Sequence, residues 1–310
     1  MGDLLDLRLA RDARPAGAAQ RLERGARRRE LVRVLQGAYA LPEDWEEASA
    51  RTRHAAMISV LRGRSASEPV FVAESAAILH ELPLIGYMPE DVRVAVPRGK
   101  GHDAYGVRRR HRVHDPRDLV TLPSGARATS RVRTAVDLAA TRSSLGGLIA
   151  MAALLGDGVR EDEIEECLAR AGAMRGIRAA RWAFAHAPRG SESPLETLVM
   201  VRCADLGFAE PEQQRLVRGV DGIEYRVDFA WRDGAILGEA DGKLKYAGGR
   251  DRPTPADVLW AEKRREDALR ARCAAFVRVG WEDAWDGIGL NVRLISARVP
   301  RVRMPRPLTW

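Results

Sequence analysis

The pattern of hydrophobic and polar positions near the start of the chain predicts helix, turn, helix and hairpin. Helical spacing is present at residues 4–10 and 18–29 with a break at Pro15, and strand-like alternation follows around Gln36-Gly37. This order is typical of a winged helix-turn-helix, whose second helix enters a major groove of DNA. A small helical cap with a solvated arginine face is an equally good interpretation of the same residues.

The middle of the chain predicts short strands followed by a run of helices. Residues 92–96 alternate as a strand does, and helical patterns begin near Thr129 and recur up to residue 187. The segment 188–194 is rich in Pro, Gly and Ser, and we interpret it as a linker. After it the pattern predicts helix, three strands, helix and strand, an order that a mixed sheet flanked by helices accommodates.

Acidic residues interrupt two apolar strands of this last region. Asp228 stands between Val227 and Phe229, while Glu239 and Asp241 follow an apolar pair across a turn predicted at 233–234. Unpaired carboxylates are costly to desolvate, so acids in such places usually bind a metal, meet a partner charge or do chemistry. Side chains in a strand alternate with period two, so Glu239 and Asp241 share a face that Asp228 can reach from the preceding strand.

The net positive charge of the chain makes a polyanion a candidate partner. Lys and Arg number 51 against 43 acids, for a net charge of +8 and a pI near 9.9. A basic excess favours association with nucleic acid, although an arginine-rich composition explains the charge as well. The residues that we expect to contact double-stranded DNA lie in two basic segments: Arg21, Arg24, Arg27, Arg28, Arg33, Arg108, Arg109 and Arg110. For the second segment, a solvated hairpin edge guarded by charge is the alternative.

The cysteines and the hydropathy of the chain bear on whether the protein is secreted, membrane-bound or cytoplasmic. The three cysteines form no Cys-x-x-Cys pair, which argues against structural zinc, and a sparse, odd count fits a reducing cytoplasm. The start of the chain carries acids and resembles no secretory signal, and no run approaches the roughly 18 apolar residues of a membrane span. We therefore expect a cytoplasmic protein without a membrane partner.

The acids and nearby lysines have the chemistry of phosphodiester hydrolysis. Asp228, Glu239 and Asp241 are candidate Mg²⁺ ligands, because Mg²⁺ prefers hard oxygen donors. Lys243 or Lys245 would orient the attacking water. Glu196 could add a ligand or orient one.

Each of these residues also has a plainer interpretation. Glu239 or Asp241 could pair only with Arg226 or Lys245, and Glu196 could be a partner of the helix dipole. Asp233 reads as a turn residue, and Glu262 with Arg265 reads equally well as a surface pair.

Several of these motifs resemble known families. Val227-Asp228-Phe229-Ala230-Trp231, Leu237-Gly238-Glu239-Ala240-Asp241-Gly242-Lys243 and Glu262–Leu269 resemble the very-short-patch-repair (Vsr)-type branch of the PD-(D/E)XK nucleases. Ser191-Glu192-Ser193-Pro194-Leu195-Glu196 is similar to the opening of that domain in actinobacterial proteins. The front half is similar to the AbiEi-type antitoxin winged-helix proteins, through Leu31–Tyr39, Glu74–His80, Val94–Gly99 and Arg133–Ala139.

The resemblance implies an α+β winged helix-turn-helix at 1–68, a mixed α/β AbiEi-like middle region at 69–190 and an α/β restriction-endonuclease-like domain at 191–310. It implies a DNA-binding protein with a Mg²⁺-dependent endonuclease domain, acting in defence, toxin–antitoxin function or repair. One residue departs from the nuclease pattern: the position two after Glu239 is Asp241 where the superfamily has lysine. The alternative is an antitoxin-type transcriptional regulator, with a cognate toxin as partner and a nuclease fold that is catalytically inactive.

Overall fold

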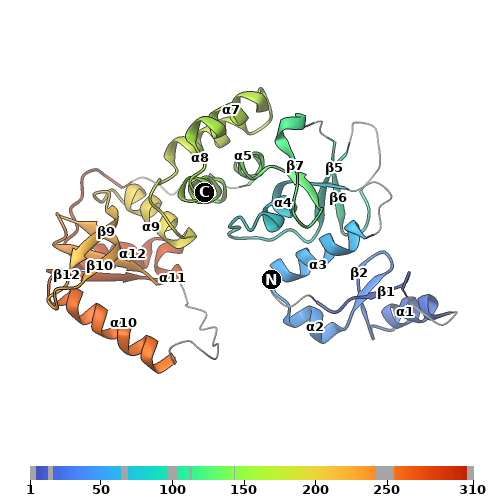
Figure 1. Cartoon of the computed structure of the whole chain (residues 1–310), viewed down its shortest axis with the longest axis horizontal. Coiled ribbons are helices and arrows are strands. Elements are labelled where there is room, and N and C mark those ends of the chain that lie inside the picture. Colours follow the sequence, from blue (N-terminus) through green and yellow to red (C-terminus); the bar gives the residue numbers. More distant parts are fainter. Residues whose placement is uncertain are drawn as a thin grey trace. The chain divides into compact units, whose positions relative to one another are not determined.

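The computed structural model divides the chain into two compact units (Figure 1). Unit 1 comprises Met1–Leu154 and Val159–Ala185, and unit 2 comprises Leu155–Gly158 and His186–Trp310. The structure describes residues 5–12, 17–63, 69–96, 103–111, 114–142, 144–241 and 255–305. The division into three domains at 68 and 190 stays a prediction.

Unit 1 begins with a small three-stranded sheet in the order β1-β3-β2. Its elements are β1 (Arg8–Leu9), α1 (Ala18–Arg27), β2 (Val32–Leu35) and β3 (Ala38–Ala40), followed by α2 (Pro42–Glu47) and α3 (Ala50–Arg62). The second helix and the hairpin are confirmed.

The helix predicted at 4–10 is wrong over the residues that the structure describes there. Arg8 and Leu9 pair antiparallel with Tyr39 and Ala38 of β3. Leu5, Leu7 and Leu9 pack against the core of the unit at a spacing of two residues, which is the period of a strand.

A five-stranded sheet and five α-helices follow in unit 1. The sheet order is β6-β5-β4-β8-β7. The elements are β4 (Val70–Phe71), α4 (Ala73–Leu79), β5 (Val92–Val96), β6 (Val107–His111), the 3-10 turn η1 (Pro116–Asp118), β7 (Leu119–Thr121), β8 (Arg127–Thr129), α5 (Arg131–Thr141), α6 (Ser144–Gly156), α7 (Glu161–Ala171) and α8 (Ile177–His186). The run of helices predicted from residue 129 onward is confirmed.

One hydrophobic core joins the two sheets of unit 1. Leu35 of the hairpin, Met57 of α3 and Phe71 of β4 are all buried in a single cluster that extends to β5, β6 and β8. The N-terminal hairpin therefore shares its apolar contacts with the middle region.

A buried group of charges ties η1 to α5 and α7, and we call it the Asp118 network. Asp118 is fully buried and accepts a hydrogen bond of 2.8 Å from Arg133 Nη1 and bonds of 3.1 and 2.9 Å from Arg170. Arg133 also donates to Asp137 at 3.0 Å. Two carboxylates thus meet two guanidinium groups in the interior of unit 1.

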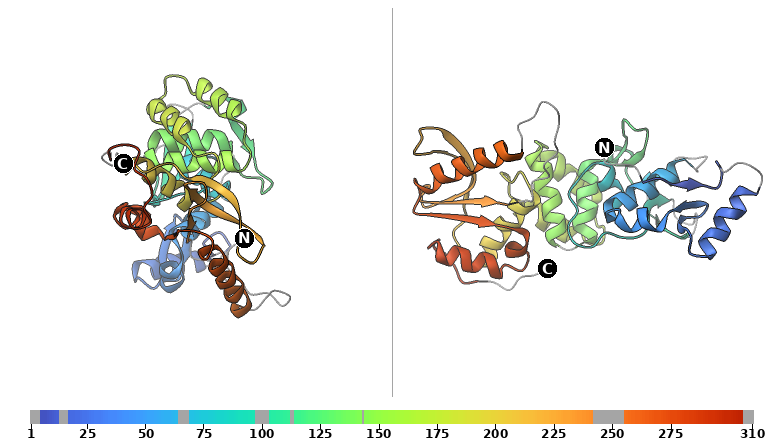
Figure 2. Two further views of the ribbon diagram at one scale, coloured as in Figure 1. Left: turned by 90° about the vertical axis from the view of Figure 1, so that its left-hand side faces the viewer. Right: turned by 90° about the horizontal axis from the view of Figure 1, so that it is seen from below.

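Unit 2 is a four-stranded mixed sheet with helices on both faces. Its elements are α9 (Pro194–Asp205), β9 (Glu212–Arg218), β10 (Glu224–Trp231), β11 (Ile236–Ala240), α10 (Pro255–Arg270), β12 (Ala275–Val279), α11 (Trp281–Trp285) and α12 (Ile288–Ser296). β9, β10 and β11 form an antiparallel meander, and β12 pairs parallel with β11 after the α10 crossover. Figure 2 shows α10 on one face of the sheet and α12 on the other. The predicted order of helix, three strands, helix and strand is confirmed.

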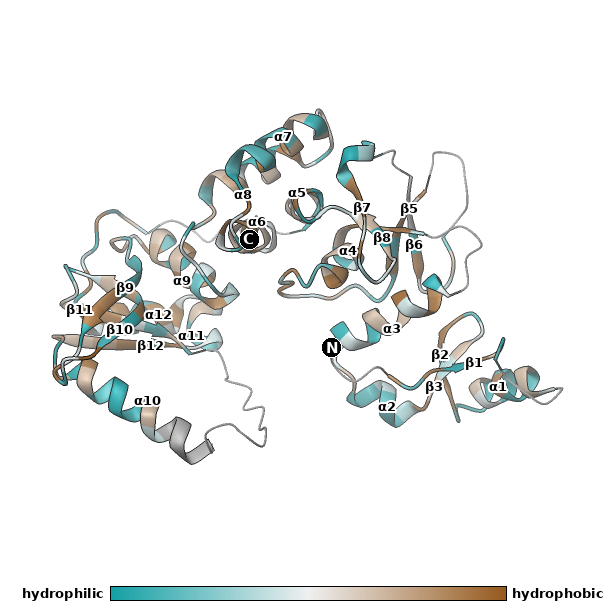
Figure 3. Ribbon diagram, viewed as in Figure 1, coloured by the Kyte–Doolittle hydropathy of each residue, from teal (hydrophilic) through white to brown (hydrophobic). Residues whose placement is uncertain are grey.

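Hydropathy differs between the strands of unit 2. β11 and β12 carry mostly hydrophobic residues, coloured brown in Figure 3, whereas β9 carries mostly hydrophilic residues. Among the described residues, none of the helices combines the length and apolarity that crossing a membrane requires.

Candidate functional site

Asp228 and Glu239 lie next to each other where two strands of unit 2 separate. The ladder between β10 and β11 ends at the pair Phe229–Gly238, and the same register sets position 228 opposite position 239. Facing residues of an antiparallel pair project to the same side of the sheet. Beyond this last pair, the side chain of Asp228 continues the contact between the strands: its Oδ2 accepts a 2.8 Å hydrogen bond from the Ala240 N–H.

The hairpin that carries these acids is held by its apolar neighbours and its turn. Val227 and Phe229, on either side of Asp228, are fully buried. Arg232, Asp233 and Gly234 all have positive φ and close the turn, so the prediction that Asp233 is a turn residue is confirmed. Asp233 also forms a 2.7 Å ion pair with Arg215.

Glu196 at the start of α9 is bonded into the site region. Ser193 caps the helix by accepting from the Glu196 N–H at 3.2 Å. The Glu196 Oε2 accepts bonds of 2.8 Å from the Glu192 N–H and from Gln214 Nε2 of β9. Burial raises the pKa of Glu196, and the charge of Asp228 raises it further. Glu196 is therefore more than a partner of the helix dipole.

Arg265 of α10 reaches over the sheet to Glu239. Its Nη2 donates to Glu239 Oε1 at 2.6 Å and to the backbone oxygen of Arg226 at 2.8 Å, and its Nη1 donates to Glu262 Oε1 at 3.1 Å. Glu262 also accepts a 3.1 Å bond from Arg278 of β12. We call Glu196, Asp228, Glu239 and Glu262 with Arg265 and Arg278 the carboxylate cluster.

Within the cluster, Glu239 has a strongly raised pKa. Burial raises its pKa to about 7, against the opposing hydrogen bond from Arg265. The charges of Asp228 and Glu262 push this pKa in the same direction as burial does. Glu239 and Glu262 bond to the two guanidinium groups, whereas Asp228 and Glu196 bond to uncharged N–H donors, so the cluster contains two more acids than arginines.

The oxygen donors of the cluster suit a magnesium ion. Mg²⁺ is commonly held by one or two carboxylates, with water and phosphate supplying the other ligands. Asp228 and Glu239 offer such a pair, and the acid excess favours a cation. As the side chains lie, no group of three or more His, Cys, Asp or Glu residues within the described ranges is placed to hold a metal ion.

The remaining predicted residues of this site are not gathered with Asp228 and Glu239. Asp241 is about half exposed and pairs with Arg278 at 3.4 Å. Arg226 pairs with Glu192 and not with Glu239 or Asp241: its two terminal nitrogens each donate a 2.7 Å hydrogen bond to one oxygen of the Glu192 carboxylate. Lys243 and Lys245 lie outside the residues that the structure describes.

Sequence reasoning missed two contributors, Gln214 and Arg278, and left the place of Arg265 open. Arg265 and Glu262 do form the i,i+3 pair that was predicted, at 3.1 Å, but the pair faces the sheet. The sequence offered no local signal for Gln214, because its partner Glu196 lies on α9, 18 residues earlier in the chain.

A basic face covers one side of α1 in unit 1. Arg21, Arg24, Arg27 and Arg28 are exposed and fall on an arc of about 120° at 3.6 residues per turn. Gly25, which lies beyond one end of this arc, is buried against Leu31. Arg21, Arg24 and Arg27 form no ion pair with any other described residue.

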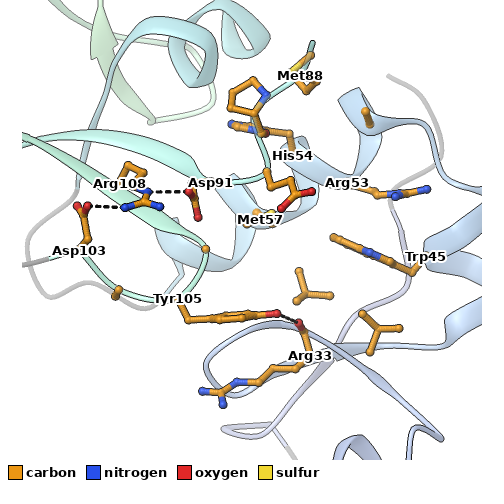
Figure 4. Close-up of a pocket in the computed structure, with 17 residues that line it drawn as sticks. Arg33, Trp45, Arg53, His54, Met57, Met88, Asp91, Asp103, Tyr105 and Arg108 are labelled. Carbon is orange, nitrogen blue, oxygen red and sulfur yellow. Dashed lines mark hydrogen bonds and ion pairs between the residues drawn. The ribbon is translucent and has the colours of Figure 1, made fainter.

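Arg33 extends this basic region at the edge of a cavity of about 620 Å³ (Figure 4). Its guanidinium lies over the Tyr105 ring at 5.3 Å, and its backbone oxygen accepts a 3.1 Å bond from the Tyr105 hydroxyl. Arg108, on another side of the cavity, is bonded to Asp91 at 2.8 Å and to Asp103 at 3.0 Å. Arg33 is thus a positioned cation, whereas Arg108 is already neutralised by two acids.

The backbone of Arg109 and Arg110 lies in β6, paired with β5. Their side chains are outside the described part of the chain.

Comparison with known proteins finds that a family model matches part of the chain. Residues 71–183 match the family described as the AbiEi antitoxin C-terminal domain. The matched residues end before the first strand of unit 2 and so do not include the carboxylate cluster.

Two curated relatives are similar to part of the chain. Uncharacterized protein MT2308 of Mycobacterium tuberculosis (strain CDC 1551 / Oshkosh) is 31% identical over 182 residues, which is 58% of this chain and 65% of the relative. Uncharacterized protein Rv2248 of Mycobacterium tuberculosis (strain ATCC 25618 / H37Rv) is similar to the same extent. The match therefore spans just under two thirds of the length of these relatives.

Proposed function

We propose that this chain is a DNA-binding protein of the antitoxin type that acts as a transcriptional regulator, with the basic face of α1 as its contact to the phosphate backbone. The observation that carries the proposal is the set of exposed arginines on one side of α1, followed in the chain by a β-hairpin. The winged helix-turn-helix remains part of this proposal, and so does a cognate toxin. The similarity of residues 71–183 to the AbiEi antitoxin domain supports both.

Salt dependence of binding tests the basic face. Each phosphate contact that is lost lowers the slope of log K against log salt by roughly 0.9, so Arg21→Ala with Arg24→Ala and Arg28→Ala is expected to lower it by about 2–3. Binding to a duplex from upstream of the chain's own gene is measured by fluorescence anisotropy at several salt concentrations.

The matched control removes three exposed arginines at and near α8, by Arg175→Ala with Arg178→Ala and Arg181→Ala. Its net charge equals that of the first variant. An equal loss of slope in both variants would show that charge alone is responsible and would contradict the proposal.

A second proposed function is Mg²⁺-dependent cleavage of DNA by unit 2 as a Vsr-like PD-(D/E)XK nuclease. It is favoured by the placement of Asp228 opposite Glu239, in a sheet whose helix and strand order resembles that superfamily. Asp228 and Glu239 would hold the ion, which when bound offsets charge on a phosphodiester and lowers the pKa of a water. Asp228 is kept in position by the Ala240 N–H, and Gln214 holds Glu196.

Lys243 or Lys245 would bind or orient the water in this proposal, with Asp241 at the position where the superfamily has lysine. Purified protein is incubated with supercoiled and linear DNA and Mg²⁺. We expect cleavage that Asp228→Asn with Glu239→Gln abolishes and that Asp233→Asn, an exposed acid of the same hairpin, leaves unchanged. Cleavage that survives the double substitution would exclude this site.

A further inference from the structure

Arg265 occupies the place beside Glu239 that a bound cation would need. We propose that Arg265 is the resident counter-ion of the carboxylate cluster, and that it competes with a divalent cation for Glu239. The inference rests on the second proposed function for the identity of the cation site, and it assigns a role to a residue that the nuclease pattern does not include.

The contacts of Arg265 are directed at the site and not at solvent. One nitrogen, Nη2, bridges Glu239 Oε1 at 2.6 Å and the Arg226 backbone oxygen at 2.8 Å. Only about a fifth of the Arg265 side chain is exposed, and an eighth of Glu239. A short charge-assisted bond in such a setting is among the stronger polar contacts in proteins.

The guanidinium suits this task better than an ammonium would. Its planar fork lets Arg265 hold Glu239 through Nη2 and Glu262 through Nη1 at the same time. Lysine carries a single compact charge and could not bond to both carboxylates in this way. The position of Glu239 is therefore maintained without a metal ion.

Coulomb repulsion makes the two cations exclude each other. A divalent ion held by Asp228 and Glu239 would lie within several ångströms of the Arg265 guanidinium. Two positive centres at that separation in a partly buried site repel each other more strongly than they would in water. The apparent affinity for the divalent ion is thus lowered by the bond that Arg265 makes.

Metal binding by the full-length protein tests the competition without any activity measurement. Mn²⁺ and Mg²⁺ are titrated by isothermal calorimetry, and the shift in Tm with metal is recorded in parallel. Arg265→Gln is expected to bind Mn²⁺ roughly tenfold more tightly than wild type or better. Arg264→Gln is the matched control, because it removes the same charge from an exposed neighbour on α10.

Two further variants keep the test decisive. Arg265→Lys retains a charge if the glutamine variant does not fold, and its affinity is expected to fall between wild type and Arg265→Gln. Adding Glu239→Gln to Arg265→Gln is expected to remove the gained affinity, which places the ion at this site. Affinity in Arg265→Gln that is unchanged, weaker or matched by Arg264→Gln would overturn the proposal.

The outcomes separate this inference from the proposed nuclease function. If wild type cleaves DNA with Mg²⁺ and Arg265→Gln binds metal as wild type does, the competition is wrong and the nuclease stands. If Arg265→Gln gains metal affinity through Glu239 and wild type does not cleave DNA, the competition stands and the nuclease is wrong. Absence of metal binding in every variant overturns the inference, and the cleavage assay then decides the function by itself.

Discussion

The Asp118 network of unit 1 and the carboxylate cluster of unit 2 are both partly buried groups of charges, but they differ in balance. In the first, two buried acids meet two arginines, the Asp118 and Arg133 side chains are at most 3% exposed, and the further partner of Arg170, Glu166, is an exposed residue. In the second, four acids lie with two arginines, two of the acids bond to neither arginine, and Glu262 and Arg278 are each 36% exposed. A buried and balanced group holds elements together, whereas an accessible group with excess charge of one sign can accept a ligand of the other sign.

The positions of the two groups in the fold agree with this difference. Asp118 joins a turn to two helices through three bonds from Arg133 and Arg170. Asp228 and Glu239 lie just beyond the last residue pair of the β10–β11 ladder, and Asp228 bonds to the Ala240 N–H through its side chain. Buried carboxylates alone do not identify a functional site, because structural ion pairs contain them too, and the charge balance is what separates the two groups.

The largest effect is expected from removing the centre of the balanced network. Asp118→Asn removes the buried acid that bonds to Arg133 and Arg170, and the loss of one partner from a buried ion pair typically destabilises a protein by about 3–5 kcal/mol. Urea unfolding followed by fluorescence measures the loss. Asp115→Asn removes a partly exposed acid that pairs with the exposed Arg117, and it is expected to have a much smaller effect. Equal effects of the two substitutions would contradict a structural role for the Asp118 network.

A pH-dependent effect is expected at the centre of the unbalanced cluster. Burial raises the pKa of Glu239 from 4.5 to about 7, so the native state binds its proton more tightly than the unfolded state does. The stability that this proton contributes is complete below pH 4.5 and is lost as pH rises through 7. Between pH 5 and pH 8, wild type should therefore lose up to roughly 3 kcal/mol relative to Glu239→Gln.

Urea unfolding at several pH values measures this difference. Glu212→Gln, which alters an exposed glutamate paired with Arg215, is the control and should track wild type. A difference between wild type and Glu239→Gln that stays constant across this range would show that Glu239 is not the group responsible.

The smallest effect is expected at the rim of the same cluster. Asp241 is about half exposed and its bond to Arg278 is 3.4 Å long, so Asp241→Asn should change the unfolding free energy by less than about 1 kcal/mol. Thermal unfolding in low and high salt measures the change. A loss as large as that of Asp118→Asn would mean that the cluster is held together as tightly as the Asp118 network.

Much of unit 2 could be predicted because its signals are local. Alternation on both sides of Asp233-Gly234 predicted the β10–β11 hairpin, and Ser193-Pro194 predicted the start of α9. The segment at 4–10 misled because Leu5, Leu7 and Leu9 fit a strand as well as a helix. The pairing of Arg8 and Leu9 with β3 makes this segment a strand, and the paired residues are about 30 positions apart in the chain.

By itself, the sequence determined which residues can carry chemistry and the order of elements that presents them. Period-two alternation and turn residues act over a few positions, so Asp228, Glu239 and the arginines of α1 could be singled out without a structure. Only the tertiary structure decided what those residues meet. It brought Arg265 from α10 onto Glu239 and Gln214 onto Glu196, because sheet register and a crossover helix bring together residues that are 26 and 18 positions apart.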